Sequence, residues 1–155
     1  MGPLQIRQAE PKDRNKLHEM LKRYRDELST ISEEPVNPTH YLPTYSENKA
    51  KRFILVFEQA NDLVGFCFIN GHSYTGADYS IAEFYIEPLH RRQSLGKYAV
   101  GQIFSAYPGK YEVRQLKKNK PAYQFWTSIL SEYNGYHDHK LGTTDFDGFL
   151  QTVRV

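Results

Sequence analysis

The segment HRRQSLGKYAV, from His90 to Val100, places two arginines, a serine and a glycine directly before an apolar helical pattern. A strand that turns straight into a helix exposes backbone N–H groups with no partner inside the helix, and they point along the positive end of its dipole. Such a turn binds anions, and arginines add charge-assisted hydrogen bonds. Gly96 permits close backbone approach or positive φ, while Ser94 keeps its backbone donor and suits a helix cap. An ordinary basic turn is the alternative, because this spacing alone is a weak signal.

Glu83 is the best candidate for a general base. It lies in YSIAEFYIEP, and strand alternation predicts that it shares a largely apolar face with Ile81 and Tyr85. Partial burial raises the pKa of a carboxyl group toward a value useful for accepting a proton. The alternative, which has equal weight, is a carboxylate paired with a lysine or arginine across the sheet.

Cysteine and histidine offer less chemistry. Cys67 lies inside the strand-like GFCFI and is interpreted as a buried small hydrophobe rather than a nucleophile. As the only cysteine it excludes an internal disulfide and fits a reducing, cytoplasmic compartment. His137 and His139 resemble half a zinc site, but no cysteine is near and no third ligand is evident. An exposed strand without a metal is therefore expected.

The elements that must position these residues follow from hydrophobic periodicity and from Gly, Pro and Asn signals. The segment 31–50, which holds three prolines, is interpreted as a structured loop. The two strands 52–58 and 63–70 are predicted to form a hairpin through an Asn61-Asp62 turn. The other predicted elements are a strand at 4–9, a helix at 11–28 with Asp13 as its cap, a strand at 79–88, a helix at 95–107, a strand at 110–116, a helix at 119–133 with an Asn cap, and closing strands near 136–142 and 149–155.

This order predicts one α/β or α+β domain. The strand–helix–strand unit from Tyr79 to Leu116 requires a crossover, so its two strands are expected to be parallel neighbours. The remaining strands favour a mostly antiparallel, twisted sheet of about seven strands with helices on both faces. Ligands prefer the carboxyl ends of parallel strands, where the His90–Val100 segment lies.

Composition narrows the function classes. The chain has 155 residues, 39% hydrophobic and 14% aromatic, which favours a packed globular domain. Its 20 basic and 18 acidic residues give a net charge of +2, which is too small to indicate a nucleic-acid binder. No apolar run is long enough to span a membrane. Basic residues do cluster locally, at Arg91, Arg92 and Lys97 and again at Lys117, Lys118 and Lys120.

Two motifs resemble those of the GNAT superfamily of N-acetyltransferases. EFYIEPLHRRQSLGKYAV is similar to its acetyl-coenzyme A signature, an Arg or Gln, two residues, Gly, any residue, then Gly or Ala. Arg91 stands first, Ser94 replaces the first glycine and Gly96 stands last. NKPAYQFW resembles the Asn-x-x-Ala-x-x-Phe-Tyr segment, with Trp126 where tyrosine is usual. The element order resembles the family's fold over essentially the whole chain.

The resemblance implies one GNAT-like domain over residues 1–155 that binds acetyl-coenzyme A and needs no metal. The backbone of Phe84, Tyr85 and Ile86 would pair with the pantetheine arm as an added strand does. Asn119 would touch the coenzyme, and Phe125 and Trp126 would flank its thioester end. The backbone donors implied for the pyrophosphate are those of Arg91, Arg92, Gln93, Ser94, Leu95, Gly96 and Lys97. Charge and topology add that the lysines at 117, 118 and 120 could reach the nucleotide phosphates.

The implied reaction is direct acetyl transfer, without an acyl-enzyme, to a primary amine of a small molecule or peptide, by a monomer or homodimer. The acid that protonates the leaving thiolate is usually the motif's tyrosine, and the indole of Trp126 cannot give up its proton at neutral pH. Three alternatives remain for protonation of the thiolate. Another tyrosine such as Tyr123 provides the proton, the solvent provides it, or the protein is a poor catalyst. The second hypothesis is a non-catalytic acyl-coenzyme A binding or sensing domain on the same fold.

Overall fold

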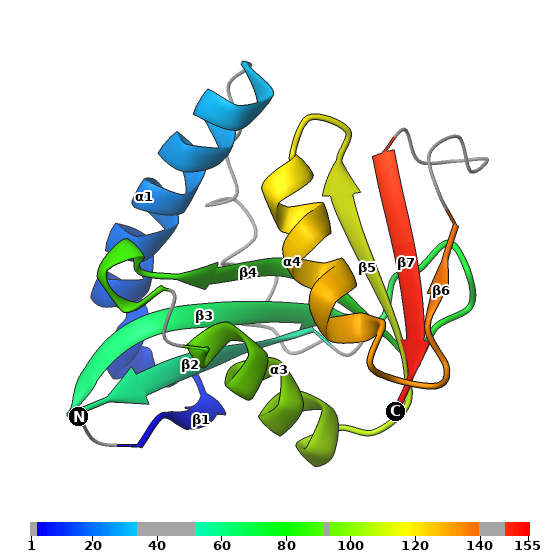
Figure 1. Ribbon diagram of the computed structural model, residues 1–155. Coiled ribbons are helices and arrows are strands. Elements are labelled where there is room, and N and C mark those ends of the chain that lie inside the picture. Colours follow the sequence, from blue (N-terminus) through cyan, green and yellow to red (C-terminus); the bar gives the residue numbers. More distant parts are fainter. Residues whose placement is uncertain (1–2, 34–51, 92–93, 140–147) are drawn as a thin grey trace.

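The computed structural model describes residues 3–33, 52–91, 94–139 and 148–155. Its strands form one seven-stranded sheet in the order β1-β2-β3-β4-β5-β7-β6 (Figure 1). The strands are β1 (Gln5–Gln8), β2 (Phe53–Gln59), β3 (Asp62–Asn70), β4 (Tyr79–Ile86), β5 (Lys110–Leu116), β6 (His137–Asp138) and β7 (Gly148–Arg154). The helices are α1 (Arg14–Ser32), α3 (Leu95–Ala106) and α4 (Lys120–Leu130), with short 3-10 turns η1 (Pro11–Asp13) and η3 (Pro88–His90).

Helices cover both faces of the sheet, as the element order predicts. α1 packs its buried face, which includes Leu17 and Met20, against residues such as Phe66 and Tyr85 of β3 and β4. α3 and α4 lie on the opposite face, where they bury the larger core (Figure 1). None of the described helices is both long and apolar enough to cross a membrane.

The hairpin of β2 and β3 confirms the predicted pairing but not the predicted turn. Its two left-handed residues are Ala60 and Asn61, with φ of 52° and 63°, one residue before the expected Asn61-Asp62 turn. Asn accepts this conformation readily, whereas Ala adopts it at a cost. The predicted loop at 31–50 overlaps the end of α1, which runs to Ser32, and lies outside the described residues from position 34.

The predicted parallel pair is present, and it is short. β4 and β5 pair in parallel from Tyr79 opposite Tyr111 to Ile81 opposite Val113. Beyond these pairs the strands diverge, while β5 remains paired with β7 along its whole length (Figure 1). We call the divergence between Ala82–Ile86 and Arg114–Leu116 the split. Its walls are therefore two strand edges that pair with no other strand of the described chain.

Candidate active site

A β-bulge in β4 sets the direction of the side chains at the split. Phe68 of β3 lies opposite Glu83, whereas the next residue, Ile69, lies opposite Ile81, so Ala82 is an extra residue in β4. An extra residue interrupts the alternation of side chains between the two faces. Ile81 consequently packs on the side of α3 and α4, while Tyr85 packs against α1. The prediction that Ile81, Glu83 and Tyr85 share one face is therefore wrong for Ile81.

Glu83 lies on the α1 side of the sheet, partly buried at the start of the split. The hydroxyl group of Tyr24, from α1, interacts with its carboxylate and favours the charged form. Burial raises the pKa of Glu83 to about 7, against the smaller lowering effect of Tyr24. Within the described residues Glu83 thus interacts with a phenol and forms no ion pair with a lysine or arginine of the kind that the alternative interpretation would require. A carboxylate with this pKa accepts protons efficiently near neutral pH.

Tyr24 is the site residue that sequence reasoning misses. The sequence marks it only as one apolar position of the helix, and its spacing carries no other signal. In the structure its ring packs edge-on against Phe66 and Tyr85, at 5.6 Å between centroids in each case. This packing holds the hydroxyl group over β4, where burial raises the pKa of Tyr24 well above its usual value.

Ser94 begins α3 in a left-handed conformation, with φ of 59° and ψ of 17°. Its side chain makes no capping hydrogen bond, so the expected role as a side-chain cap is not met. The first intrahelical bond runs from the N–H of Tyr98 to the carbonyl oxygen of Ser94. The N–H groups of Leu95, Gly96 and Lys97 therefore lie before the helical ladder, in the arrangement that binds anions.

Gly96 serves packing rather than backbone freedom. It is not among the residues with positive φ, and it is buried in the first turn of α3. A Cβ atom at this position would lie 2.6 Å from Cε1 and 2.8 Å from Cζ of Phe125. The glycine thus lets the ring of Phe125, on α4, contact the start of α3 directly.

The side chains of Arg91 and Lys97 in this loop are engaged in contacts within the protein. The guanidinium group of Arg91 donates to the carbonyl oxygen of Ile86 at 2.8 Å and to Glu27 of α1 at 2.9 Å. The backbone N–H of Arg91 donates to the carbonyl oxygen of Pro88. The side chain of Lys97 forms an ion pair with Glu132 at 2.9 Å. The predicted binding residues Arg92 and Gln93 lie outside the described residues.

The second motif brings three aromatic rings together beside the split. Phe84, on the side of β4 opposite Glu83, lies 5.5 Å from Phe125 and 5.2 Å from Trp126, measured between ring centroids. Trp126 is only 4% exposed and belongs to the core. Asn119 caps α4 as predicted, since its Oδ1 accepts a hydrogen bond from the N–H of Ala122 at 3.3 Å.

Tyr123, the candidate acid, faces a different part of the sheet. Its ring stacks on Phe149 of β7 with centroids 4.0 Å apart, and its hydroxyl group donates to Asp138 of β6. This hydrogen bond, followed by burial, raises the pKa of Tyr123. Its contacts with β6 and β7 indicate a packing role.

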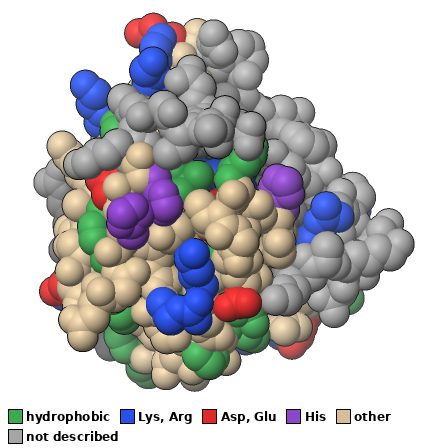
Figure 2. Space-filling model, turned by 90° about the vertical axis from the view of Figure 1, so that its right-hand side faces the viewer, with side chains coloured by type: hydrophobic (Ala, Val, Ile, Leu, Met, Phe, Trp, Pro, Cys, Tyr) green, Lys and Arg blue, Asp and Glu red, His purple; other side chains and the backbone are tan. Residues whose placement is uncertain are grey.

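The structure assigns other contacts to the remaining candidate residues. His137 and His139 have ring centroids 4.4 Å apart on the edge strand side of the sheet, and histidine side chains reach the surface there (Figure 2). In the described part of the chain they belong to no group of three residues that could hold a metal. Cys67 is fully buried in the core, in agreement with its interpretation as a hydrophobe. Lys118 forms an ion pair with Glu33 at the end of α1, at 2.9 Å.

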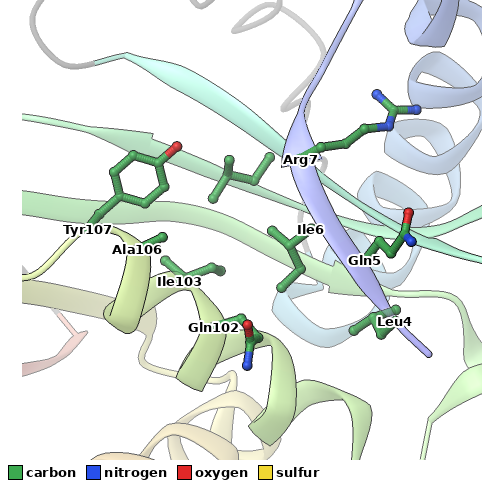
Figure 3. Close-up of a pocket in the computed structure, with 9 residues that line it drawn as sticks. Leu4, Gln5, Ile6, Arg7, Gln102, Ile103, Ala106 and Tyr107 are labelled. Carbon is green, nitrogen blue, oxygen red and sulfur yellow. The ribbon is translucent and has the colours of Figure 1, made fainter.

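A cavity of about 400 Å³ lies between β1 and α3 (Figure 3). Ile6, Ile103 and Tyr107 line its apolar part. The guanidinium group of Arg7 points away from these residues and binds Asp13 at 2.7 and 2.9 Å. Because the charged group is turned outward, we do not assign chemistry to this cavity.

Comparison with known proteins agrees with this geometry. The family model described as Acetyltransferase (GNAT) family matches residues 15–130. No curated protein matches the sequence significantly. Similar solved structures include an acetyltransferase from Thermus thermophilus, with a TM-score of 0.77, 15% identity, and coverage of 98% of this chain and 97% of that one.

Two further structures are similar at lower scores. The ribosomal-protein-S18-alanine N-acetyltransferase from Escherichia coli has a TM-score of 0.64 and 13% identity, with 98% and 94% of the chains covered. The PaiA N-acetyltransferase from Thermoplasma acidophilum, in complex with coenzyme A, has a TM-score of 0.62 and 14% identity, with 99% of each chain covered. At these identities the structures establish the fold, while the family match, over three quarters of the chain, establishes descent: the protein belongs to the GNAT family of acetyltransferases.

Proposed function

We propose that this protein transfers the acetyl group of acetyl-coenzyme A directly to a primary amine, with Glu83 as the general base. The observation that carries the proposal is the partly buried position of the Glu83 carboxyl group at the start of the split, where burial raises its pKa to about 7. The acceptor is a primary amine of a small molecule or a peptide, and the reaction runs in the cytoplasm.

The residues around the split fit the coenzyme. The edge of β4 at Phe84, Tyr85 and Ile86, which pairs with no described strand on the side of the split, offers backbone groups to an extended pantetheine arm, and the carbonyl oxygen of Ile86 also accepts a hydrogen bond from Arg91. The first turn of α3 offers N–H donors and a positive dipole end to the pyrophosphate. Phe125 and Trp126 border the same edge through Phe84, and Asn119 opens α4 nearby. The PaiA protein, which has this fold, was crystallised with coenzyme A.

Glu83 then accepts the proton that the amine loses. A neutral amine attacks the thioester carbonyl carbon, the C–N bond forms, and the C–S bond breaks. The amine's proton goes to the carboxylate of Glu83 directly or through a water, and the departing thiolate takes a proton from solvent. Cys67 takes no part, because it is buried and burial raises the pKa of its thiol far above neutrality. Activity is expected to rise with pH through about 7, where Glu83 loses its proton.

Replacing Glu83 with Gln tests the proposal. The variant should keep its affinity for acetyl-coenzyme A but lose about 100-fold or more in kcat/KM, and the activity should no longer follow a titration near pH 7. Thiol release with a panel of primary amines measures the rate, and titration calorimetry measures the affinity. Glu19→Gln, at an exposed position of α1, is the matched control and should retain full activity.

Thermal unfolding with coenzyme A, with acetyl-coenzyme A and without ligand comes first. A ligand that binds only the folded state raises Tm. An unchanged Tm at saturating ligand contradicts coenzyme binding altogether. A raised Tm without turnover of any amine favours the second hypothesis, a non-catalytic acyl-coenzyme A sensor, which rests on Trp126 in place of an acidic tyrosine. Glu83→Gln with unaltered turnover at every pH contradicts the base assignment.

A further inference from the structure

Gln115, near the end of β5, carries a buried amide group without a partner among the described residues. The residue is 4% exposed, and in the part of the chain that the structure describes neither its Nε2 nor its Oε1 has a hydrogen-bond partner. Buried side-chain amides normally form hydrogen bonds within the protein, because burial removes their hydrogen bonds to water and an unreplaced bond costs free energy. An amide that is unpaired at both ends therefore indicates a partner that the described residues do not supply.

The position of Gln115 identifies the space that this partner occupies. Alternation along β5 places Gln115 on the same face as Tyr111 and Val113, which belong to the core beneath α3 and α4. Its cross-strand neighbour Phe149 stacks on Tyr123 of α4, so this part of the face is covered by α4. Gln115 also follows Val113, the last residue of β5 that pairs with β4. The amide thus lies under α4 in the wall of the split.

A second glutamine on the same face has a side-chain amide that forms hydrogen bonds within the protein. Gln151 of β7 lies opposite Val113 and is fully buried. Its Nε2 donates to Oγ1 of Thr127 at 2.8 Å and to the hydroxyl group of Tyr136 at 3.0 Å, while its Oε1 has no partner among the described residues. Gln151 thereby joins β7 to α4. Gln115, two pairs along the same two strands, makes no such bond within the described residues.

We propose that the side-chain amide of Gln115 binds an amide group of the coenzyme's pantetheine arm. A secondary amide presents one carbonyl oxygen and one N–H, and a carboxamide presents the matching donor and acceptor. The opposite wall of the split, β4, offers backbone groups, so the arm would be bound by main chain on one side and by Gln115 on the other. This inference rests on the proposed function, since it requires the coenzyme in the split.

Gln115→Met tests the inference, because methionine keeps the length of the side chain and removes both polar ends. Without ligand, the variant should be at least as stable as the wild type, since an unpaired buried amide is replaced by an apolar group. Its Kd for coenzyme A should rise about tenfold, the loss of one to two neutral hydrogen bonds. Its Kd for adenosine 3′,5′-bisphosphate, which carries the nucleotide but no pantetheine, should not change. Titration calorimetry and thermal unfolding provide these values.

Gln151→Met is the matched control. It breaks bonds within the protein, so Tm should fall without ligand. An unchanged Kd for coenzyme A in Gln115→Met would overturn the inference, and so would an equal loss of affinity for the bisphosphate, which would indicate a general disturbance of the fold. A variant that is markedly less stable without ligand would also overturn it, because the amide would then have a structural partner. If the wild type does not bind coenzyme A at all, the proposed function itself fails first.

Discussion

Ser94 adopts the left-handed backbone conformation that glycine usually provides at this position. Its φ of 59° lies in the region that glycine adopts freely, and the family's motif has glycine at this position. A non-glycine residue pays about 1–2 kcal/mol for a left-handed conformation. The backbone N–H of serine is retained, so the anion-binding geometry survives, and the cost falls on stability.

Substitution of Ser94 should separate these two effects. Ser94→Gly should change the free energy of unfolding by less than about 0.5 kcal/mol, because relief of strain is offset by the greater freedom of glycine in the unfolded chain. Ser94→Val should lose about 1–2 kcal/mol, since a β-branched residue is strongly disfavoured at positive φ. Urea unfolding measures both variants. A valine variant as stable as the wild type would show that position 94 does not need a left-handed backbone.

At the scale of the elements, the contact between α3 and α4 depends on one missing methyl group. A Cβ at Gly96 would overlap the ring of Phe125, whereas a Cβ at Gly101, in the same helix, meets nothing within 4 Å. The two glycines therefore offer a matched pair with opposite expected outcomes.

Gly96→Ala should lower the free energy of unfolding by about 1–3 kcal/mol through overpacking, and should weaken coenzyme binding by displacing the first turn of α3. Gly101→Ala should raise it by up to about 1 kcal/mol, because alanine is the better helix former. Denaturant unfolding and coenzyme titration of both variants provide the check. Equal gains in stability at the two positions would contradict the close packing of Phe125 on α3.

The elements themselves could be predicted because each depends on local periodicity. β5 begins at Lys110 and ends at Leu116, as expected, and the parallel pair follows from the crossover rule alone. The bulge at Ala82 could not be predicted, because it is defined by the register of β4 against β3. The pattern of apolar and polar residues in the sequence of β4 does not reveal it. The contact of Tyr24 with Glu83 joins residues far apart in the chain and arises only from packing. The sequence analysis identifies Gly96 as a position that needs glycine, but it attributes this need to backbone approach to a phosphate. In the structure the need arises from the close contact with the ring of Phe125.

For the whole molecule, two carboxyl groups with opposite pKa shifts shape the dependence of stability on pH. The ion pair with Arg7 holds the pKa of Asp13 below its ordinary value of 3.8, so this contribution to stability is lost as the pH falls below that value. Burial raises the pKa of Glu83 from 4.5 to about 7. The folded state therefore holds this proton more tightly, and its stability decreases as the pH rises from 4.5 through 7.

Glu83→Gln should remove the second effect. Below pH 4.5 the variant and the wild type should be about equally stable, because Glu83 is protonated in both the folded and the unfolded state. Above pH 7 the variant should be more stable by roughly 3 kcal/mol, the free energy that corresponds to the raised pKa. Urea unfolding at a series of pH values measures the difference. A constant difference across this range would contradict the raised pKa.

The short parallel pairing of β4 with β5 also has a mechanical consequence. Among the described residues, only the pairs from Tyr79–Tyr111 to Ile81–Val113 join the main chain of the sheet's first four strands to that of its last three. Under the proposed function, a coenzyme bound along β4 and to Gln115 would connect the two halves just beyond these pairs. The ligand would thus add a second connection between two half-sheets whose main chains are otherwise joined, in the described sheet, by three residue pairs.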